Sequence, residues 1–141
     1  MWNGRMSVLL VEDDEVEATA VMRSFRNLKI DHTVVVAHDG VEALQRLRCE
    51  NGYKRLPTPL VILLDLSMPR MGGHEFLQEL RHDPSLHRTT VFVMTASTAE
   101  KDRALAYKNN VAGYIVKDGR GQNLAEVISM LRLYCQMVAA A

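Results

Sequence analysis

Five short runs of apolar, mostly β-branched or aliphatic residues recur along the chain and restrict its fold more than any other feature. They occupy residues 8–11, 34–37, 60–64, 91–94 and 114–116. Each run is apolar at nearly every position rather than at every second one, which is typical of strands buried on both faces of a sheet. Such a sheet needs a covering layer on each face, so we expect helices between the strands.

The segments between the runs have apolar residues at the spacing of a helix face. The first segment carries them three or four positions apart, at Ala18, Val21, Met22, Phe25 and Leu28. Similar spacing predicts helices around residues 41–47 and 76–80, and two more at about 99–109 and 122–138. This alternation predicts an α/β fold with a doubly wound, five-stranded parallel sheet and helices on both faces.

Length and charge limit the functions that the chain can have. Its 141 residues suit one domain, and 17 basic against 17 acidic residues argue against a binder of nucleic acid or anionic membranes. Cys49 and Cys135 form no CxxC pair, and no histidine stands at zinc-site spacing. No apolar stretch is long enough for a signal peptide or a membrane span, so we expect a cytoplasmic protein.

Residues that could bind a metal or a phosphoryl group follow four of the five predicted strands directly. In chain order they are Glu12, Asp13 and Asp14, then Asp65, then Thr95 with Ser97 two positions on, and finally Lys117. Ligands of open parallel sheets bind beyond the carboxyl ends of the strands, near the point where the strand order reverses. We therefore expect acids, a hydroxyl and an amine to meet at one edge of the sheet.

This set of side chains suits phosphoryl transfer to a carboxylate. Carboxylates brought together repel one another, and one would take up a proton unless a cation lay among them. Mg²⁺ fits, because it binds one or two carboxylates together with the phosphate of a substrate. Lysine offsets the remaining charge and an aspartate can carry the phosphoryl group covalently. Singly, each residue has an ordinary explanation, and Asp14 is interpreted as a helix N-cap; the prediction depends on their joint position.

The surrounding motifs resemble those of response-regulator receiver domains, which are phosphorylated in two-component signalling. Residues 64–73, LDLSMPRMGG, resemble the phosphoacceptor loop D-x-x-M-P-x-M-x-G, and this match is specific. VLLVED at 8–13, MTAS at 94–97 and GYIVK at 113–117 resemble the motifs of the first, fourth and fifth strands. The resemblance covers about residues 6–138. It implies a flavodoxin-like (βα)₅ fold, a single receiver domain over residues 1–141 and no output domain.

The resemblance also implies the chemistry of the site. Asp65 is expected to be the nucleophile and phosphoacceptor, Asp13 a direct Mg²⁺ ligand, and Glu12 a ligand through water. The backbone carbonyl of Ser67 is expected to complete the metal site, in which Mn²⁺ can replace Mg²⁺. Ser67 and Ser97 flank the site and are expected to tune the lifetime of the phosphorylated state.

A conformational response is implied as well. Lys117 is expected to pair with Asp65 and then with the phosphoryl group, which Thr95 and the adjoining Ala96 also bind. Tyr114 is expected to swing inward after Thr95 and to change the surface of the fourth helix, fifth strand and fifth helix. The donor would be a sensor histidine kinase. Residues 95–102 resemble those of small receivers that pair with bacterial phytochromes and other light or stress sensors.

One position departs from the family pattern. Receivers usually have proline after the lysine, often with a cis bond, whereas Asp118 follows Lys117 here. A cis bond before a residue other than proline costs roughly 2.5–4 kcal/mol. We therefore predict a trans Lys117–Asp118 bond and a rearranged loop through residues 119–121.

The fifth predicted helix has more apolar positions than one buried face requires. One stripe, which includes Leu124, Val127 and Leu131, suits contact with the sheet, while Met130, Leu133 and Met137 form a second. Exposed apolar faces mark interaction surfaces, and methionine suits adaptable contacts. We expect a homodimer or a docked partner through this helix and the adjoining region of the fourth helix and fifth strand, unless the helix is simply more deeply buried.

Other functions remain as alternatives. An aspartyl phosphatase usually has a second acid two residues after the nucleophile, where this chain has Ser67. A nucleotide or flavin binder would need a glycine-rich loop after the first strand, where this chain is acidic. The chain could also be a degenerate receiver that binds partners without phosphorylation, a phosphate sink, or a shuttle in a relay.

Overall fold

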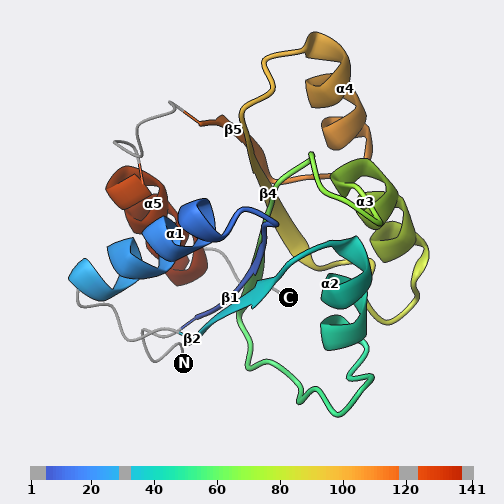
Figure 1. Cartoon of the computed structure of the whole chain (residues 1–141), viewed down its shortest axis with the longest axis horizontal. Coiled ribbons are helices and arrows are strands. Elements are labelled where there is room, and N and C mark those ends of the chain that lie inside the picture. Colours follow the sequence, from blue (N-terminus) through green and yellow to red (C-terminus); the bar gives the residue numbers. More distant parts are fainter. Residues whose placement is uncertain (1–5, 29–32, 118–123, 138–141) are drawn as a thin grey trace.

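The computed structural model describes residues 6–28, 33–117 and 124–137, in which strands and helices alternate as predicted (Figure 1). The strands are β1 (Ser7–Val11), β2 (Thr33–Ala37), β3 (Leu60–Leu64), β4 (Thr90–Thr95) and β5 (Gly113–Val116). The helices are α1 (Glu15–Asn27), α2 (Gly40–Leu47), α3 (Gly73–His82), α4 (Glu100–Lys108) and α5 (Leu124–Met137). All strand pairs are parallel, in the order β2-β1-β3-β4-β5, so the predicted doubly wound sheet is confirmed.

The strand order reverses between β1 and β3, and this reversal gives the molecule its two helical layers. The chain runs outward from β1 to β2, returns to β3 on the other side of β1, and continues to β5. Helices α1 and α5 pack together on one face, whereas α2, α3 and α4 cover the other (Figure 1). The carboxyl ends of β1 and β3 therefore lie side by side at the switch point.

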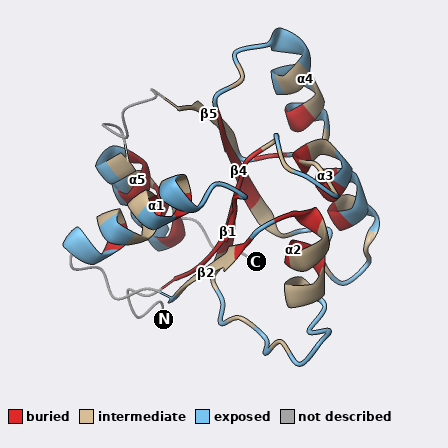
Figure 2. Cartoon of the chain, in the orientation of Figure 1, coloured by how far each residue is buried: buried red, intermediate tan, exposed pale blue. Residues whose placement is uncertain are grey.

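Alternate residues of each central strand supply the cores on the two faces. Leu10 and Leu63 belong to the core under α1 and α5, whereas Leu9 and Ile62 belong to the core under α2, α3 and α4. Because both faces are covered, β1 and β3 are buried at almost every position, as the red colour of β1 in Figure 2 illustrates, and this explains their continuous apolar sequences. No helix in the described ranges is long and apolar enough to cross a lipid bilayer.

Gly73 lets α3 begin close against the end of β3, and substitution there is predicted to be costly. A Cβ atom at Gly73 would lie 2.7 Å from both the carbonyl oxygen of Asp65 and the Cα of Leu66. These are backbone atoms, so we expect Gly73→Ala to lower the free energy of unfolding by about 2 kcal/mol. Urea unfolding measures this, and Gly72→Ala is the matched control, because a Cβ there would meet one atom at an ordinary 3.5 Å. Equal losses in the two variants would contradict the prediction.

Candidate functional site

Strand register brings the predicted acids together at the switch point. Val11 of β1 lies opposite Leu64 of β3, and the amide of Asp65 donates to the carbonyl of Val11 over 3.0 Å. Glu12 and Asp65 therefore leave neighbouring strands at the same level. Both are buried, with 2% of Glu12 and 8% of Asp65 exposed to solvent, which is unusual for acidic residues without a charged partner.

Lys117 reaches this pair from the end of β5, the edge strand that lies beyond β4. Thr95 of β4 lies opposite Val116 of β5, and the amide of Lys117 donates to the carbonyl of Thr95 over 2.8 Å. The Nζ atom of Lys117 donates to Oε1 of Glu12 over 2.8 Å and lies 3.8 Å from Oδ2 of Asp65. The amine therefore lies among the acids, as expected from the strand ends, but the expected pairing with Asp65 is not a hydrogen bond here, because Lys117 donates to Glu12 instead.

Glu17 is a member of this cluster that the sequence did not reveal. Its Oε2 atom accepts a second hydrogen bond from Nζ of Lys117 over 2.7 Å. Carboxylate oxygens of Glu12, Glu17 and Asp65 all lie within 4.8 Å of one another. Glu17 does not follow a strand; it stands in the first turn of α1, three residues after the N-cap. The acidic first turn was the available signal, because a helix that begins at the switch point turns one side of that turn toward the site.

The cluster carries an excess of negative charge in a buried position. When ionised, its three carboxylates outnumber the single ammonium of Lys117 by two charges. Burial raises the pKa of Glu12 above its ordinary value, the charge of Asp65 adds to this effect, and Lys117 opposes it. Burial alone would lower the pKa of Lys117, but its bonds to Glu12 and Glu17 outweigh burial and raise it. A bound cation would favour the ionised carboxylates, so the donor set fits a divalent metal.

The other two residues of the acidic turn lie outside the cluster. Asp14 caps α1, and its Oδ1 atom accepts hydrogen bonds from the amides of Val16 and Glu17, as its interpretation as an N-cap predicted. Asp13 is exposed and does not belong to the group of carboxylates that the described residues bring within 4.8 Å. Its predicted role as a direct metal ligand stays a prediction.

The residues after β4 form a small hydrogen-bonded network. Thr95 is buried, Ala96 is exposed, and the hydroxyl of Ser97 donates to Oδ2 of Asp102 over 2.6 Å. Tyr114 is half-buried, and its hydroxyl donates to the carbonyl of Ser97 over 3.1 Å. The proposed switch residues Thr95 and Tyr114 are thus linked through one loop. The Ser97 hydroxyl thus donates its hydrogen bond to a residue in the first turn of α4.

The loop between β3 and α3 is hydrogen-bonded to the beginning of α2. Nε of Arg70 donates to Oδ2 of Asp39 over 2.7 Å, and the amide of Gly40 donates to the carbonyl of Met71 over 3.1 Å. The amide of Ser67 donates to Oδ1 of Asp65 over 3.4 Å, so Ser67 adjoins the site as predicted. Asp39 also accepts a hydrogen bond from the amide of Glu42 as the N-cap of α2.

Loss of Asp39 is predicted to destabilise the protein in a pH-dependent way. Burial alone would raise the pKa of Asp39, but its bonds from Arg70 and the Glu42 amide hold it below the usual 3.8. Asp39→Ala should lower the free energy of unfolding by about 1 kcal/mol through the lost cap. Asp39→Asn keeps a side-chain oxygen that can cap the helix and removes only the negative charge.

The lowered pKa of Asp39 fixes the direction of the pH effect. A depressed pKa in the folded state stabilises the protein above the unfolded pKa and loses this effect as the pH falls through the folded pKa. The difference in unfolding free energy between the parent and Asp39→Asn should therefore have its full value at pH 7 and disappear below about pH 3.8. Urea midpoints at several pH values measure it, and a gap that persists in acid would contradict the assignment.

The predicted trans bond between Lys117 and Asp118 and the predicted loop through residues 119–121 lie outside the described residues. Both stay predictions.

The second apolar stripe predicted on α5 is only partly exposed. Leu133 and Met137 are exposed, at 54% and 75%, as the second stripe requires. Met130 is instead partly buried against the same core as Tyr134, because it lies at the edge of the face that contacts the sheet. The inclusion of Met130 in an exposed stripe was wrong.

Known proteins resemble this chain over most of its length. Response regulator Rcp1 from Synechocystis is 34% identical over 89% of this chain and 83% of its own. A probable methanogenesis regulatory protein, FilR2 from Methanothrix harundinacea, is also 34% identical, over 90% of this chain and 81% of its own.

Solved structures of response regulators are also similar to this chain. The phosphorylated cyanobacterial phytochrome response regulator RcpA has a TM-score of 0.83 and 31% identity, over 94% of this chain and 95% of that one. The Mn²⁺-bound form of Rcp1 has a TM-score of 0.76 and 32% identity, over 94% and 93%. The family model of the response regulator receiver domain matches residues 8–129. With this match, the register of β1 and β3 and the Lys117 cluster, the chain belongs to the response regulator receiver domain family and serves phosphorylation-dependent two-component signalling.

Proposed function

We propose that the chain is a switch that accepts a phosphoryl group on Asp65 from a phosphohistidine of a sensor histidine kinase. The observation that carries the proposal is the buried Asp65 carboxylate at the end of β3, beside the Lys117 ammonium and two further carboxylates. An oxygen of Asp65 attacks phosphorus, and a P–O bond forms as the P–N bond to histidine breaks. The imidazole nitrogen leaves with the bonding electron pair. Lys117 offsets charge on the transferred group.

Magnesium is the metal that we propose for this site. Glu12, Asp13, Asp65 and the carbonyl of Ser67 would hold it, and the crowding of carboxylate oxygens within 4.8 Å supports a cation there. Bound Mg²⁺ would supply neutralisation of the negative charge that gathers on the transferring phosphoryl oxygens. The Mn²⁺-bound form of Rcp1, 32% identical to this chain, supports a divalent metal and the use of Mn²⁺ as a substitute.

The output of the switch would be a changed surface over α4, β5 and α5. The phosphoryl group draws Thr95 and Lys117 toward Asp65, and the loop after Thr95 carries the change onward. The bond from the Tyr114 hydroxyl to the carbonyl of Ser97 supports this route, because it ties β5 to that loop. A phytochrome-type sensor as the kinase is supported by the likeness to RcpA, a phytochrome response regulator.

Intact mass measurement tests the phosphoryl transfer. Parent protein incubated with acetyl phosphate and Mg²⁺ should gain one phosphoryl group, and chelation of the metal should prevent the gain. Asp65→Asn keeps the shape of the side chain and removes the nucleophilic oxygen, so it should gain none. The absence of any adduct on the parent, with several small phosphoryl donors, would contradict the proposal and favour a degenerate receiver.

We propose no further catalytic turnover beyond this self-catalysed transfer and slow loss of the phosphoryl group. An aspartyl phosphatase would place an acid two residues after the nucleophile, whereas this chain has an exposed Ser67 there. A serine at this position cannot protonate a leaving alcohol as an acid there would. Assays with phosphomonoesters should therefore detect no sustained hydrolysis.

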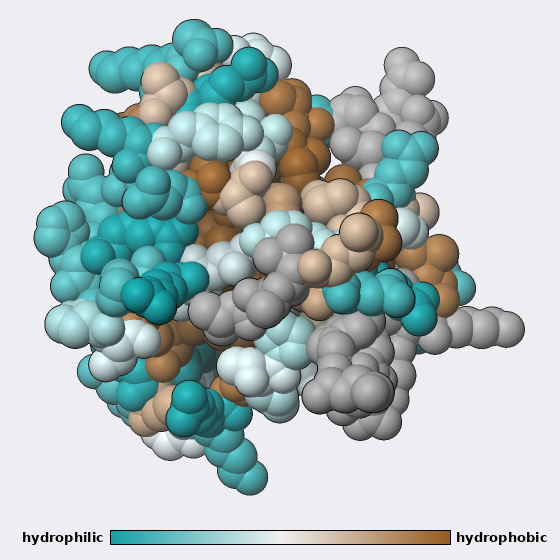
Figure 3. All heavy atoms as spheres, turned by 180° about the vertical axis from the view of Figure 1, so that it is seen from behind, coloured by the Kyte–Doolittle hydropathy of each residue, from teal (hydrophilic) through white to brown (hydrophobic). Residues whose placement is uncertain are grey.

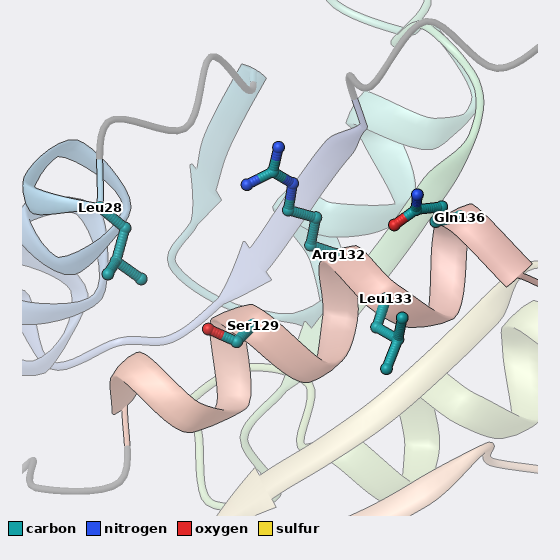
Figure 4. A pocket seen from close by; sticks show the side chains of 5 residues that line it. All are labelled: Leu28, Ser129, Arg132, Leu133 and Gln136. Carbon is teal, nitrogen blue, oxygen red and sulfur yellow. The ribbon is translucent and has the colours of Figure 1, made fainter.

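We further propose that the outer side of α5 takes part in a homodimer. Leu133 and Met137 are exposed, and a shallow pocket lies between the end of α1 and α5, lined by Leu28, Ser129, Arg132, Leu133 and Gln136 (Figure 4). On the rear face of the molecule, hydrophobic atoms gather in the middle, and hydrophilic ones cover the side of α2 and α3 (Figure 3). Light scattering of phosphorylated and unphosphorylated protein tests this, and a monomer mass in both forms would exclude the dimer.

A further inference from the structure

We propose that Glu17 is a positioning residue that holds Lys117 away from Asp65 in the unphosphorylated protein and competes with the phosphoryl group for it. This role rests on the proposed phosphorylation of Asp65. It adds to the receiver site a residue outside the four strand-end motifs.

Distances around the Lys117 ammonium show where its hydrogen bonds go. Nζ lies 2.7 Å from Oε2 of Glu17 and 2.8 Å from Oε1 of Glu12, whereas Oδ2 of Asp65 is 3.8 Å away. The last distance is longer than a hydrogen bond allows. Glu12 and Glu17 thus take two of the three donors of the ammonium, and Asp65 receives none of these bonds.

Burial decides which of the two glutamates gives up Lys117. The side chain of Glu12 is only 3% exposed, so little water can reach it to take the place of the ammonium of Lys117. The side chain of Glu17 is 45% exposed, so water can replace the ammonium at little cost. When a phosphoryl group on Asp65 attracts Lys117, the contact that breaks is therefore the one to Glu17.

This competition predicts the direction in which removal of Glu17 changes the affinity for a phosphoryl analogue. A phosphoryl group, or an analogue bound to Asp65, gains Lys117 only after the Glu17 contact is lost. Removal of the Glu17 carboxylate should therefore favour the phosphoryl-bound state over the free state. A half-exposed ion pair is worth little, so the effect corresponds to about two- to fivefold in affinity. Salt screens such a pair, and the effect should shrink as ionic strength rises.

The test measures the affinity for beryllofluoride in the presence of Mg²⁺, because this anion mimics a phosphoryl group on a carboxylate. Four proteins, each comprising residues 1–141, are compared: the parent, Glu17→Gln, Glu17→Asp and Glu15→Gln. The Asp variant keeps the charge but shortens its reach, and Glu15→Gln removes the same charge from an exposed position in the same helical turn. Circular dichroism verifies the fold of each.

We expect Glu17→Gln to bind beryllofluoride about two- to fivefold more tightly than the parent. Glu17→Asp should bind more tightly as well, and Glu15→Gln should match the parent. The gap between parent and Glu17→Gln should narrow between about 20 and 500 mM salt, a response that a merely structural role would not give. Unchanged or weaker binding by Glu17→Gln would overturn the role of Glu17 alone. Absence of Mg²⁺-dependent binding to the parent would overturn the proposed function together with it.

Discussion

Lys117→Met is expected to lower the free energy of unfolding of the metal-free protein by about 3 kcal/mol. Methionine fills similar space but leaves Glu12, whose side chain is 3% exposed, beside Asp65 without a cation. Removal of one partner from a buried ion pair typically costs about 3–5 kcal/mol, and the value should fall at the lower end because Glu12 can take up a proton. Urea unfolding at pH 7 measures the loss.

Magnesium distinguishes this electrostatic cause from lost packing. Added Mg²⁺ supplies positive charge to the same carboxylates, so it should raise the unfolding free energy of Lys117→Met more than that of the parent. Lys108→Met at the exposed end of α4 is the control and should change stability by less than about 0.5 kcal/mol. An equal response to Mg²⁺ in Lys117→Met and parent would contradict the charge account.

The sign of the pH effect follows from the raised pKa of Lys117. A group whose pKa is raised in the folded state contributes stability below its unfolded pKa, and this stability is lost as the pH rises through the folded pKa. The difference in unfolding free energy between the parent and Lys117→Met should therefore persist through neutral pH. It should begin to decrease only above the ordinary lysine pKa of 10.5.

Phe76→Ala is expected to lower the free energy of unfolding by about 3–5 kcal/mol. Phe76 lies in the first turns of α3, is 0% exposed, and packs in the core beneath α2, α3 and α4. Its removal leaves a cavity directly below the helix that follows the phosphoacceptor loop. Val16→Ala, at a position on α1 that is 80% exposed, is the control and should cost little. A loss below about 1 kcal/mol for Phe76→Ala would contradict the assignment of this core.

The positions and ends of the strands along the chain could be predicted from the sequence because both are local properties. Runs such as 60–64 are apolar throughout, and the residue after each run is polar. In a parallel sheet, strands that start from the same side end at the same edge, so Asp65 and Lys117 could be expected near each other. Only the register, Val11 against Leu64, sets how near Glu12 comes to Asp65.

What the sequence did not reveal depends on how helices turn against the sheet. Glu17 enters the site because α1 begins at the switch point with that side of its first turn facing Lys117. Asp13 adjoins Glu12 in sequence but is exposed, since successive residues at a strand end point in different directions. Met130 lies at the edge of the face of α5 that contacts the sheet, a rotation that spacing alone does not determine.

The most direct measurement of the central claim identifies the residue that carries the phosphoryl group. Parent protein treated with acetyl phosphate and Mg²⁺ is reduced with borohydride, which converts an acyl phosphate into an alcohol, and its peptides are sequenced by mass spectrometry. We predict homoserine at position 65 and at no other acidic position, and none when Mg²⁺ is chelated. Homoserine at Asp13, or the longer hydroxypentanoic side chain that reduction of a glutamyl phosphate would leave at Glu12 or Glu17, is excluded by this account, as is the absence of any reduced residue; either result would contradict it.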